Sequence, residues 1–283
     1  MRIAAIIAGL IAAVSLPGPA SASPFNVSAE SGSQDIDYKC AFRISFQLIG
    51  YVSTGSAIGA AALCSKSDGG DGYVAGAFSL TTKHGTALAA INEYKQRPAY
   101  NKEFDALIPT LEKYNETMSG STDGLDAFCN AWTTAAKNEY DFYGAQIKVI
   151  RDMYEGPALE VARSLNIRYP LTRSAMTNVA LMGGLGKQGD ALGAVVAAAN
   201  AGFAKDVKGT SGNSVKVGNY AVDEMVWLDA FLDAWDKLSN GASSSKTKIY
   251  ASLYKNNHLQ LDDMIAFTGF ANQPVSFKCE KLF

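Results

Sequence analysis

The first 22 residues have the three-part pattern of a secretory signal peptide. One arginine precedes an apolar run over residues 3–16, a Pro-Gly-Pro break follows at 17–19, and Ala-Ser-Ala at 20–22 matches the small-residue cleavage pattern. The apolar run is shorter than the ~20 residues that a membrane-spanning helix needs. We therefore expect cleavage after residue 22, leaving residues 23–283 as one secreted, extracellular domain with no membrane partner.

Secretion into an oxidising compartment decides how the cysteines are interpreted. Cys40, Cys64, Cys129 and Cys279 are even in number and widely spaced, which predicts two disulfides. Four cysteines allow three pairings, and the spacing does not choose among them. Cys279 lies four residues before the end of the chain, so we expect its bridge to hold the C-terminal tail.

Composition excludes several classes of protein. Apolar residues make up 48% of the 283-residue chain and the net charge is −2, so the chain can build a core and is not intrinsically disordered. The near-neutral charge gives no sign of a nucleic-acid partner. With two histidines and no closely spaced cysteines, we expect no zinc motif. Sequons at Asn26 and Asn115 make the chain a candidate glycoprotein if its source is eukaryotic.

The hydrophobic spacing predicts a mainly α domain with a small β part. Residues 223–238 have the clearest amphipathic helix pattern. Residues 42–52 fit either a strand or a helix, and residues 73–80 fit a short strand. Thr86 and Asn101 are predicted helix N-caps. Further helices are expected over 125–153, 158–165, 172–182, 190–203 and 249–256, with a break at Gly156-Pro157 and loops at 208–216 and 239–248.

Four segments, in order over most of the mature chain, resemble the family 46 glycoside hydrolases, which are secreted chitosanases with a lysozyme-like fold. The first begins with Gly70-Asp71-Gly72 before a short strand, and the second is a Trp-Thr-Thr-Ala-Ala helix at 132–136. The third ends in Met-Gly-Gly-Leu-Gly at 182–186, and the fourth runs from Asp223-Glu224 to Phe-Leu-Asp-Ala at 231–234. The resemblance implies a two-lobed α+β fold with a cleft between the lobes.

The resemblance also implies a reaction, the inverting endo-hydrolysis of β-1,4-linked glucosamine in chitosan. Two carboxyl groups perform it, one as general base and one as general acid, so no metal and no organic cofactor are expected. The base carries over to Asp71, with Asp68 as a possible substitute. A turn aspartate that binds its own backbone is the structural alternative for both. We expect the protein to act as a monomer on chitosan or a related amino-sugar polymer.

The general acid of the family does not carry over in the same way. Its place at the end of the first helix corresponds to Ser53, and a serine hydroxyl is too weak an acid to protonate a glycosidic oxygen. Other family positions differ too, with Val74, Thr86 and Trp235 in place of Thr, Asp and Arg. Glu30, in a Ser-Ala-Glu-Ser segment similar to that around the family's acid, is the alternative catalytic acid. The competing hypothesis is a catalytically impaired protein that binds amino sugars or acts as an effector.

Several further residues are candidates for binding the polymer. An acidic stripe formed by Asp229, Asp233 and Asp236 has helical spacing, and it is interpreted either as a solvated helix face or as a wall that binds a polycation. Glu155 is a possible addition to that wall. The full set of predicted substrate-binding residues is Asp68, Tyr73, Thr86, Asp229 and Asp233.

Overall fold

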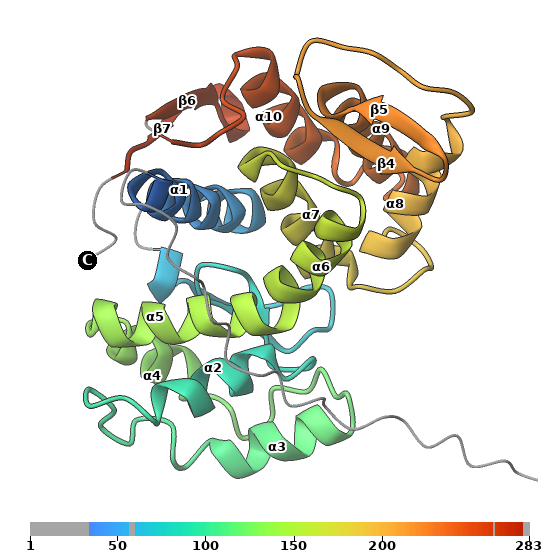
Figure 1. The fold of residues 1–283 in the computed structure, drawn as a ribbon. Helices are drawn as coiled ribbons and strands as arrows, with labels where there is room; N and C mark the ends of the chain where they lie inside the picture. Colours follow the sequence, from blue (N-terminus) through green and yellow to red (C-terminus); the bar gives the residue numbers. More distant parts are fainter. Residues whose placement is uncertain (1–33, 57–59, 263, 280–283) are drawn as a thin grey trace, which may run out of the picture.

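The computed structural model describes residues 34–56, 60–262 and 264–279, and α-helices dominate it (Figure 1). Short turns of other helix types are η1 (Ala60–Ala62) and η3 (Phe270–Asn272), both 3-10, and η2 (Arg151–Glu155), which is a π-helical turn. The α-helices are α1 (Gln34–Thr54), α2 (Thr86–Tyr94), α3 (Ile108–Glu116), α4 (Phe128–Ala135), α5 (Glu139–Ile150), α6 (Gly156–Ser164), α7 (Pro170–Gly183), α8 (Leu192–Ala201), α9 (Glu224–Leu238) and α10 (Ser244–Lys255).

The strands pair into small antiparallel sheets. Within the described residues these are a three-stranded sheet and two separate hairpins. The strands are β1 (Cys64–Lys66), β2 (Tyr73–Ala75), β3 (Leu80–Thr81), β4 (Ser214–Val217), β5 (Tyr220–Asp223), β6 (Ile265–Thr268) and β7 (Pro274–Phe277). The predicted mainly α fold with a small β part is confirmed. Of the described helices, none combines the length and the hydrophobicity of a membrane span.

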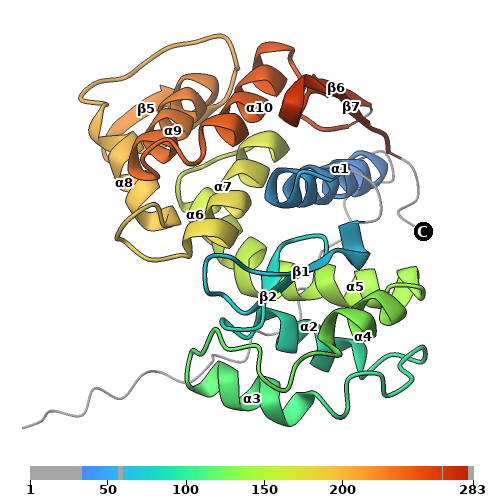
Figure 2. The ribbon, with the colours of Figure 1, turned by 180° about the vertical axis from the view of Figure 1, so that it is seen from behind.

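Buried side chains form two separate hydrophobic cores, and these define two lobes. In the upper lobe, α6 to α10 and the hairpins β4–β5 and β6–β7 surround a core that includes Trp227, Phe231 and Trp235. In the lower lobe, α2 to α5 pack with β2 and β3 around Trp132 and Phe142. Figures 1 and 2 show α8 to α10 and the two hairpins above, α2 to α5 below, and α6 and α7 beside α1.

Helix α1 lies between the lobes and contributes to both cores. Ile44 and Leu48 are buried in the upper core, whereas Phe46 and Ile49 are buried in the lower one. This explains why residues 42–52 fit both a strand and a helix pattern. A helix that is buried on two sides carries apolar residues at nearly every second position, so the spacing alone does not distinguish it from a strand.

A second connection between the lobes runs through α5, η2 and α6. One helix was expected over 125–153 with a break at Gly156-Pro157, and both expectations are wrong. The chain instead breaks at Asn138, which has non-helical dihedral angles and donates from its side chain to the hydroxyl of Tyr94. Pro157 lies in the first turn of α6, where a missing N–H group costs nothing, so the helical path continues past it.

The single strand predicted over residues 73–80 is a hairpin. Strands β2 and β3 pair with Val74 opposite Thr81, and residues 76–79 form the turn. Gly76 has a φ of 78°, and a Cβ at this position would lie 2.4 Å from Oε1 of Gln146. The turn therefore needs glycine here for both its backbone conformation and its close approach to the lower core.

Both predicted N-caps are displaced in the structure. Thr86 is the first residue of α2 rather than its cap, and Gly85 occupies the cap position with a φ of 71°. The helix after Pro98 begins at Ile108, so Asn101 does not cap it. The hydroxyl of Thr86 accepts from the backbone N–H of Thr81 instead, which ties the start of α2 to β3.

Three further segments differ from their predicted structure. The polar, Gly-rich segment 208–216 was expected to be a loop, but its end forms β4 and pairs with β5. The predicted loop 239–248 already contains the first turns of α10. The alanine-rich segment 190–203 is typical of a buried helix, yet α8 is buried on only one face, through Leu192, Val195 and Ala199. In each case tertiary packing, rather than local composition, decides the structure.

Both predicted disulfides are present, and each holds one lobe. Cys40 of α1 pairs with Cys279, which confirms that the last bridge holds the C-terminal tail. Cys64 of β1 pairs with Cys129 of α4, so the small sheet is tied to the helices of the lower lobe.

Candidate active site

The loop that joins β1 to β2, called here the Asp71 loop (residues 67–72), presents Asp71 at the open end of the β2–β3 hairpin. The backbone N–H of Lys83 donates to the carbonyl of Asp71 at 3.3 Å, which extends the pairing of β2 and β3 beyond the strands. Gly72 has a φ of 75°, and a Cβ at this position would lie 2.2 Å from Oγ1 of Thr82. Because only glycine fits there, the loop holds Asp71 in a defined position.

The side chains of a lysine and a histidine approach the carboxylate of Asp71. Oδ1 of Asp71 lies 3.3 Å from Nζ of Lys83 and 3.6 Å from Nε2 of His84. The three side chains are 35%, 29% and 47% exposed, respectively, so the group is open to solvent. This arrangement could not be predicted from the sequence, because it depends on the register of the hairpin.

The other predicted site residues of the lower lobe lie on or near this loop, but they differ in exposure. Asp68 is exposed on the same loop, three residues before Asp71. The ring of Tyr73 is half-buried and stacks on Phe128 with centroids 5.2 Å apart. Thr86 is buried, with its hydroxyl bound to the backbone of Thr81. A role in sugar binding stays a prediction for all three residues. Asp68 and Tyr73 are accessible to a ligand, whereas Thr86 is enclosed by the protein.

Ser53 lies near the end of α1, half-buried where the lobes meet. Its hydroxyl donates to the carbonyl of Ile49 at 2.8 Å, and its own carbonyl accepts from Oγ of Ser79 at 3.1 Å. The Ser53 hydroxyl is therefore already hydrogen-bonded within α1. Glu30, the alternative acid, lies outside the described residues.

The hairpin fixes the spacing between the end of α1 and the Asp71 loop. Ser79, which Ser53 contacts, stands at the turn end of the hairpin, and Lys83, which Asp71 contacts, stands at the other end. Three residues lie between them, and only two of these, Leu80 and Thr81, are in a strand, so the two contact points lie at most about 13 Å apart. The hairpin therefore connects the end of α1, through the carbonyl of Ser53, to the Asp71 loop.

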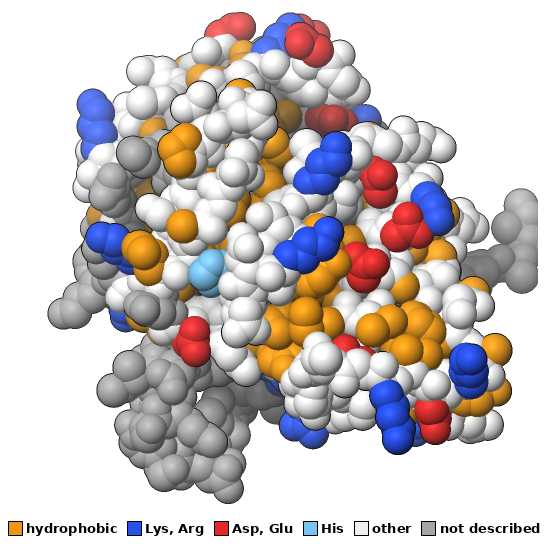
Figure 3. Space-filling model, turned by 90° about the horizontal axis from the view of Figure 1, so that it is seen from above, with side chains coloured by type: hydrophobic (Ala, Val, Ile, Leu, Met, Phe, Trp, Pro, Cys, Tyr) orange, Lys and Arg blue, Asp and Glu red, His pale blue; other side chains and the backbone are white. Residues whose placement is uncertain are grey.

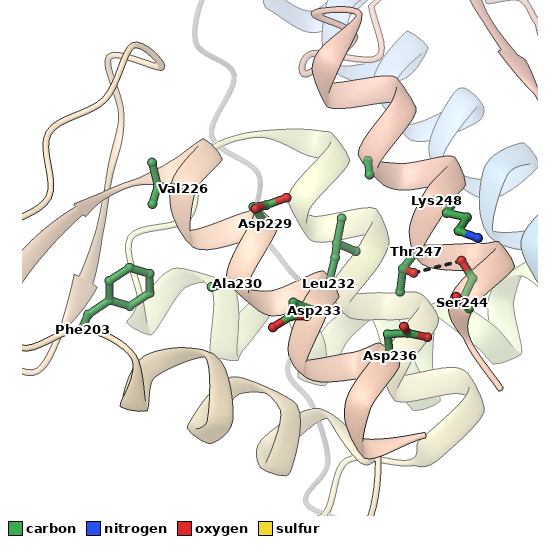
Figure 4. Close-up of a pocket in the computed structure, with 11 residues that line it drawn as sticks. Phe203, Val226, Asp229, Ala230, Leu232, Asp233, Asp236, Ser244, Thr247 and Lys248 are labelled. Carbon is green, nitrogen blue, oxygen red and sulfur yellow. Dashed lines mark hydrogen bonds between the residues drawn. The ribbon is translucent and has the colours of Figure 1, made fainter. Parts of the chain in front are cut away.

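The acidic stripe of α9 lies in the upper lobe and lines a groove of about 530 Å³. Seen from above, hydrophobic side chains gather on this part of the molecule with acidic and basic side chains around them (Figure 3). In the close-up, Asp229, Asp233 and Asp236 follow one another along α9, and Ser244, Thr247 and Lys248 stand on α10 opposite them (Figure 4). Phe203, Val226, Ala230, Leu232 and Ala251 complete the lining.

Two of these aspartates already have partners in the protein. Oδ1 of Asp229 accepts from the hydroxyl of Tyr254 at 2.6 Å, and Oδ2 of Asp233 lies 2.6 Å from Nζ of Lys237. The structure thus places Asp229 and Asp233 together in the upper lobe and Asp68, Asp71, Tyr73 and Thr86 together in the lower lobe. It does not bring the two groups into one cluster.

Glu155 is a titratable group whose environment the sequence did not predict. It ends the π-helical turn η2, and its neighbour Tyr154 packs against both cores. Burial raises the pKa of Glu155 to about 7, although the positive charge of Arg151 acts in the opposite direction. A π-turn of this kind is often found at functional sites, and here it joins the two lobes.

Glu224 is buried at the start of α9 and has a structural role. Its carboxylate accepts from the backbone N–H groups of Arg168 and Tyr169, both at 2.9 Å, just before α7 begins. Burial raises the pKa of Glu224, and these two hydrogen bonds act against the rise. Elsewhere in the described part of the chain, no three His, Cys, Asp or Glu side chains converge in the way that metal ligands do.

Comparisons with known proteins relate the chain to chitosanases. The family model described as Glycosyl hydrolase family 46 matches residues 62–263, a span that includes the Asp71 loop and begins after Ser53. The chain is 29% identical to a chitosanase of Bacillus subtilis (strain 168) over 209 residues, which cover 70% of this chain and 71% of the relative.

Solved structures of chitosanases have the same fold. One is a mutant chitosanase from Bacillus subtilis MY002 complexed with 6 GlcN, which matches with a TM-score of 0.69 and 24% identity over 87% of this chain and 100% of the other. Another is a GH46 chitosanase of Gynuella sunshinyii in complex with chitotetraose, with a TM-score of 0.69 and 22% identity over 87% and 98% of the two chains. These matches confirm the two-lobed, lysozyme-like fold.

Proposed function

The chain belongs to glycosyl hydrolase family 46, and from this premise we propose that it is a secreted enzyme that hydrolyses β-1,4-linked glucosamine polymers such as chitosan. The observation that carries the proposal is Asp71, held by a glycine-restricted loop and exposed to solvent within the region that the family match covers. The relatives support the choice of substrate, since their solved complexes contain 6 GlcN or chitotetraose.

In the proposed inverting reaction, Asp71 takes a proton from a water molecule as that water attacks the anomeric carbon. A second carboxylic acid protonates the departing glycosidic oxygen, and the two carboxyl groups stand roughly 6.5–9.5 Å apart. Glu30 is the proposed acid, because Ser53 at the end of α1 has no acidic proton to give.

Secretion is part of the proposal. The signal-peptide pattern over residues 1–22 supports it, and so do the two disulfides, since such bonds persist in oxidising compartments. Protein for the assay is therefore best recovered from culture medium, where determination of its N-terminus shows whether the chain begins near Ser23.

The test is the release of reducing ends from soluble chitosan. Asp71→Asn is expected to lower the rate by at least about 100-fold, because it removes the base. Asp126→Asn, an exposed aspartate of the lower lobe, is the matched control and is expected to leave the rate unchanged. Glu30→Gln is expected to have an effect as large as that of Asp71→Asn. Equal rates for the wild type and Asp71→Asn would contradict the proposed function.

The second candidate function is a protein that binds amino-sugar oligomers without cleaving them. The observation that favours it is Ser53, whose hydroxyl is held by the carbonyl of Ile49 where the family has its acid. If this is correct, the wild type binds glucosamine oligomers but releases no reducing ends, and Ser53→Glu gains a measurable rate. Hydrolysis by the wild type that disappears in Glu30→Gln would rule this alternative out.

A further inference from the structure

Lys83 is held beside Asp71 by the backbone of the β2–β3 hairpin. Its N–H donates to the carbonyl of Asp71 at 3.3 Å, just beyond the paired strands. Oγ1 of Thr82 accepts from the N–H of Tyr73 at 3.0 Å, which fixes the neighbouring position of the hairpin. The side chain of Lys83 therefore starts from a defined point next to that of Asp71, although both side chains reach the surface.

The two oxygens of the Asp71 carboxylate have different surroundings. Nζ of Lys83 donates to Oδ1 at 3.3 Å, whereas Nε2 of His84 lies 3.6 Å from the same oxygen, beyond the range of a hydrogen bond. Oδ2 lies on the side of Gly69, where an added Cβ would come within 3.6 Å of it. Gly69 is exposed and has no side chain, so this side of the carboxylate is open to a water molecule.

This asymmetry bears on how Asp71 could act as a base. A general base needs one oxygen aimed at the water molecule from which it takes a proton. The carboxylate of an exposed aspartate turns over a broad range about its Cβ–Cγ bond, and most of these orientations aim that oxygen elsewhere. A charge-assisted hydrogen bond to the other oxygen restricts the rotation, because the bond is lost when the carboxylate turns.

We propose that Lys83 is a positioning residue that holds Oδ1 of Asp71, so that Oδ2 is the oxygen that takes the proton from the attacking water. The oxygen of that water forms the new bond to the anomeric carbon while its proton passes to Oδ2. Lys83 keeps its own proton and touches no substrate in this role. The inference rests on the proposed function, in which Asp71 is the general base.

The experiment measures kcat and KM for the release of reducing ends from soluble chitosan. Lys83→Met keeps much of the side-chain volume but cannot donate, so kcat is expected to fall about tenfold while KM changes less than about twofold. Lys83→Arg restores a charged donor and is expected to keep kcat within about threefold of the wild type. Lys113→Met, at an exposed lysine of α3, is the matched control and is expected to keep both wild-type values.

A purely electrostatic role of Lys83 predicts a different result. Chitosan is a polycation, so a lysine that only repels the polymer would weaken its binding. Lys83→Met would then lower KM and leave kcat unchanged, and the effect would fade as added salt screens the charges. That outcome would overturn the inference.

Combining Lys83→Met with Asp71→Asn separates the inference from the proposed function. If Lys83 acts through Asp71, Lys83→Met lowers kcat no further once Asp71 is replaced by asparagine. An equal loss in both backgrounds, or a wild-type kcat for Lys83→Met, would overturn the inference alone. A wild-type rate for Asp71→Asn, or no release of reducing ends by the wild type, would overturn the proposed function together with it.

Discussion

At the scale of single residues, Glu224 shows how a buried carboxyl group holds the start of a helix. Its two carboxylate oxygens each accept one backbone N–H, from Arg168 and Tyr169. Glu224→Gln keeps the shape but turns an NH₂ group toward one of these donors. A buried donor left without an acceptor costs about 1–3 kcal/mol, so we expect a loss of stability of this size.

Urea unfolding of Glu224→Gln beside the wild type measures this loss. Glu112→Gln, an exposed glutamate of α3, is the control and is expected to stay within about 0.5 kcal/mol of the wild type. Identical unfolding midpoints for Glu224→Gln and the wild type would mean that the segment before α7 does not depend on these hydrogen bonds.

Some site residues were accessible from the sequence and others were not. Asp71 was predicted from the resemblance of Gly70-Asp71-Gly72 to the family's motif, and its role as the base stays a prediction. The approach of Lys83 and His84 to it was not found, since the contact depends on which residues pair across the hairpin. Asp229 and Asp233 were correctly placed on one helix face, but the sequence did not show that this face lies in the other lobe, away from Asp71.

At the scale of elements, the π-helical turn η2 places a carboxyl group where its charged form is unfavourable. The pKa of Glu155 is about 7 in the folded protein, against an ordinary value of 4.5, because the side chain is largely buried. Below pH 4.5 the group is protonated in both states and has no effect on stability. As the pH rises from 4.5 to 7, the unfolded chain loses its proton first, so the free energy of unfolding falls and stays lower above pH 7.

Glu155→Gln removes this titration and is expected to stabilise the protein at high pH. At pH 8 the free energy of unfolding should rise by about 2 kcal/mol, a figure lowered for the partial exposure of the side chain. Near pH 4 this difference from the wild type should vanish. Thermal unfolding across this pH range measures the effect, with Glu160→Gln on the exposed side of α6 as the control. A difference between wild type and Glu155→Gln that does not change with pH would contradict the assigned pKa.

The elements differ in how far their sequences determine them. Helix α9 was predicted almost to the residue, because one apolar stripe faces one core and Asp223 caps the helix through the N–H groups of Met225 and Val226. The π-turn η2 leaves no periodic pattern, since a single wide turn shifts the helix face without changing composition. Strands β4 and β5 were missed because only three of their apolar residues reach the core, Val215, Val217 and Val222.

At the scale of the whole molecule, two hydrophobic cores share one helix, and this decides how the protein unfolds. Adjacent residues of α1 point into different lobes, with Leu48 fully buried in the upper core and Ile49 fully buried in the lower one. If α1 stays folded only while both cores are intact, the loss of either core removes support from the other. The molecule then unfolds in a single transition, although its lobes have separate cores and a separate disulfide each.

Leu48→Ala and Ile49→Ala form a matched pair for testing this coupling. Each removes a fully buried branched side chain and is expected to cost about 2–5 kcal/mol through lost burial and the cavity that remains. Under the shared-helix interpretation, both variants lower the midpoint of one calorimetric transition, and fluorescence from the tryptophans of the two lobes changes at the same temperature. The contrary result is two transitions, with Leu48→Ala shifting only one and Ile49→Ala only the other. That result would show that the lobes unfold independently and that α1 belongs to one of them.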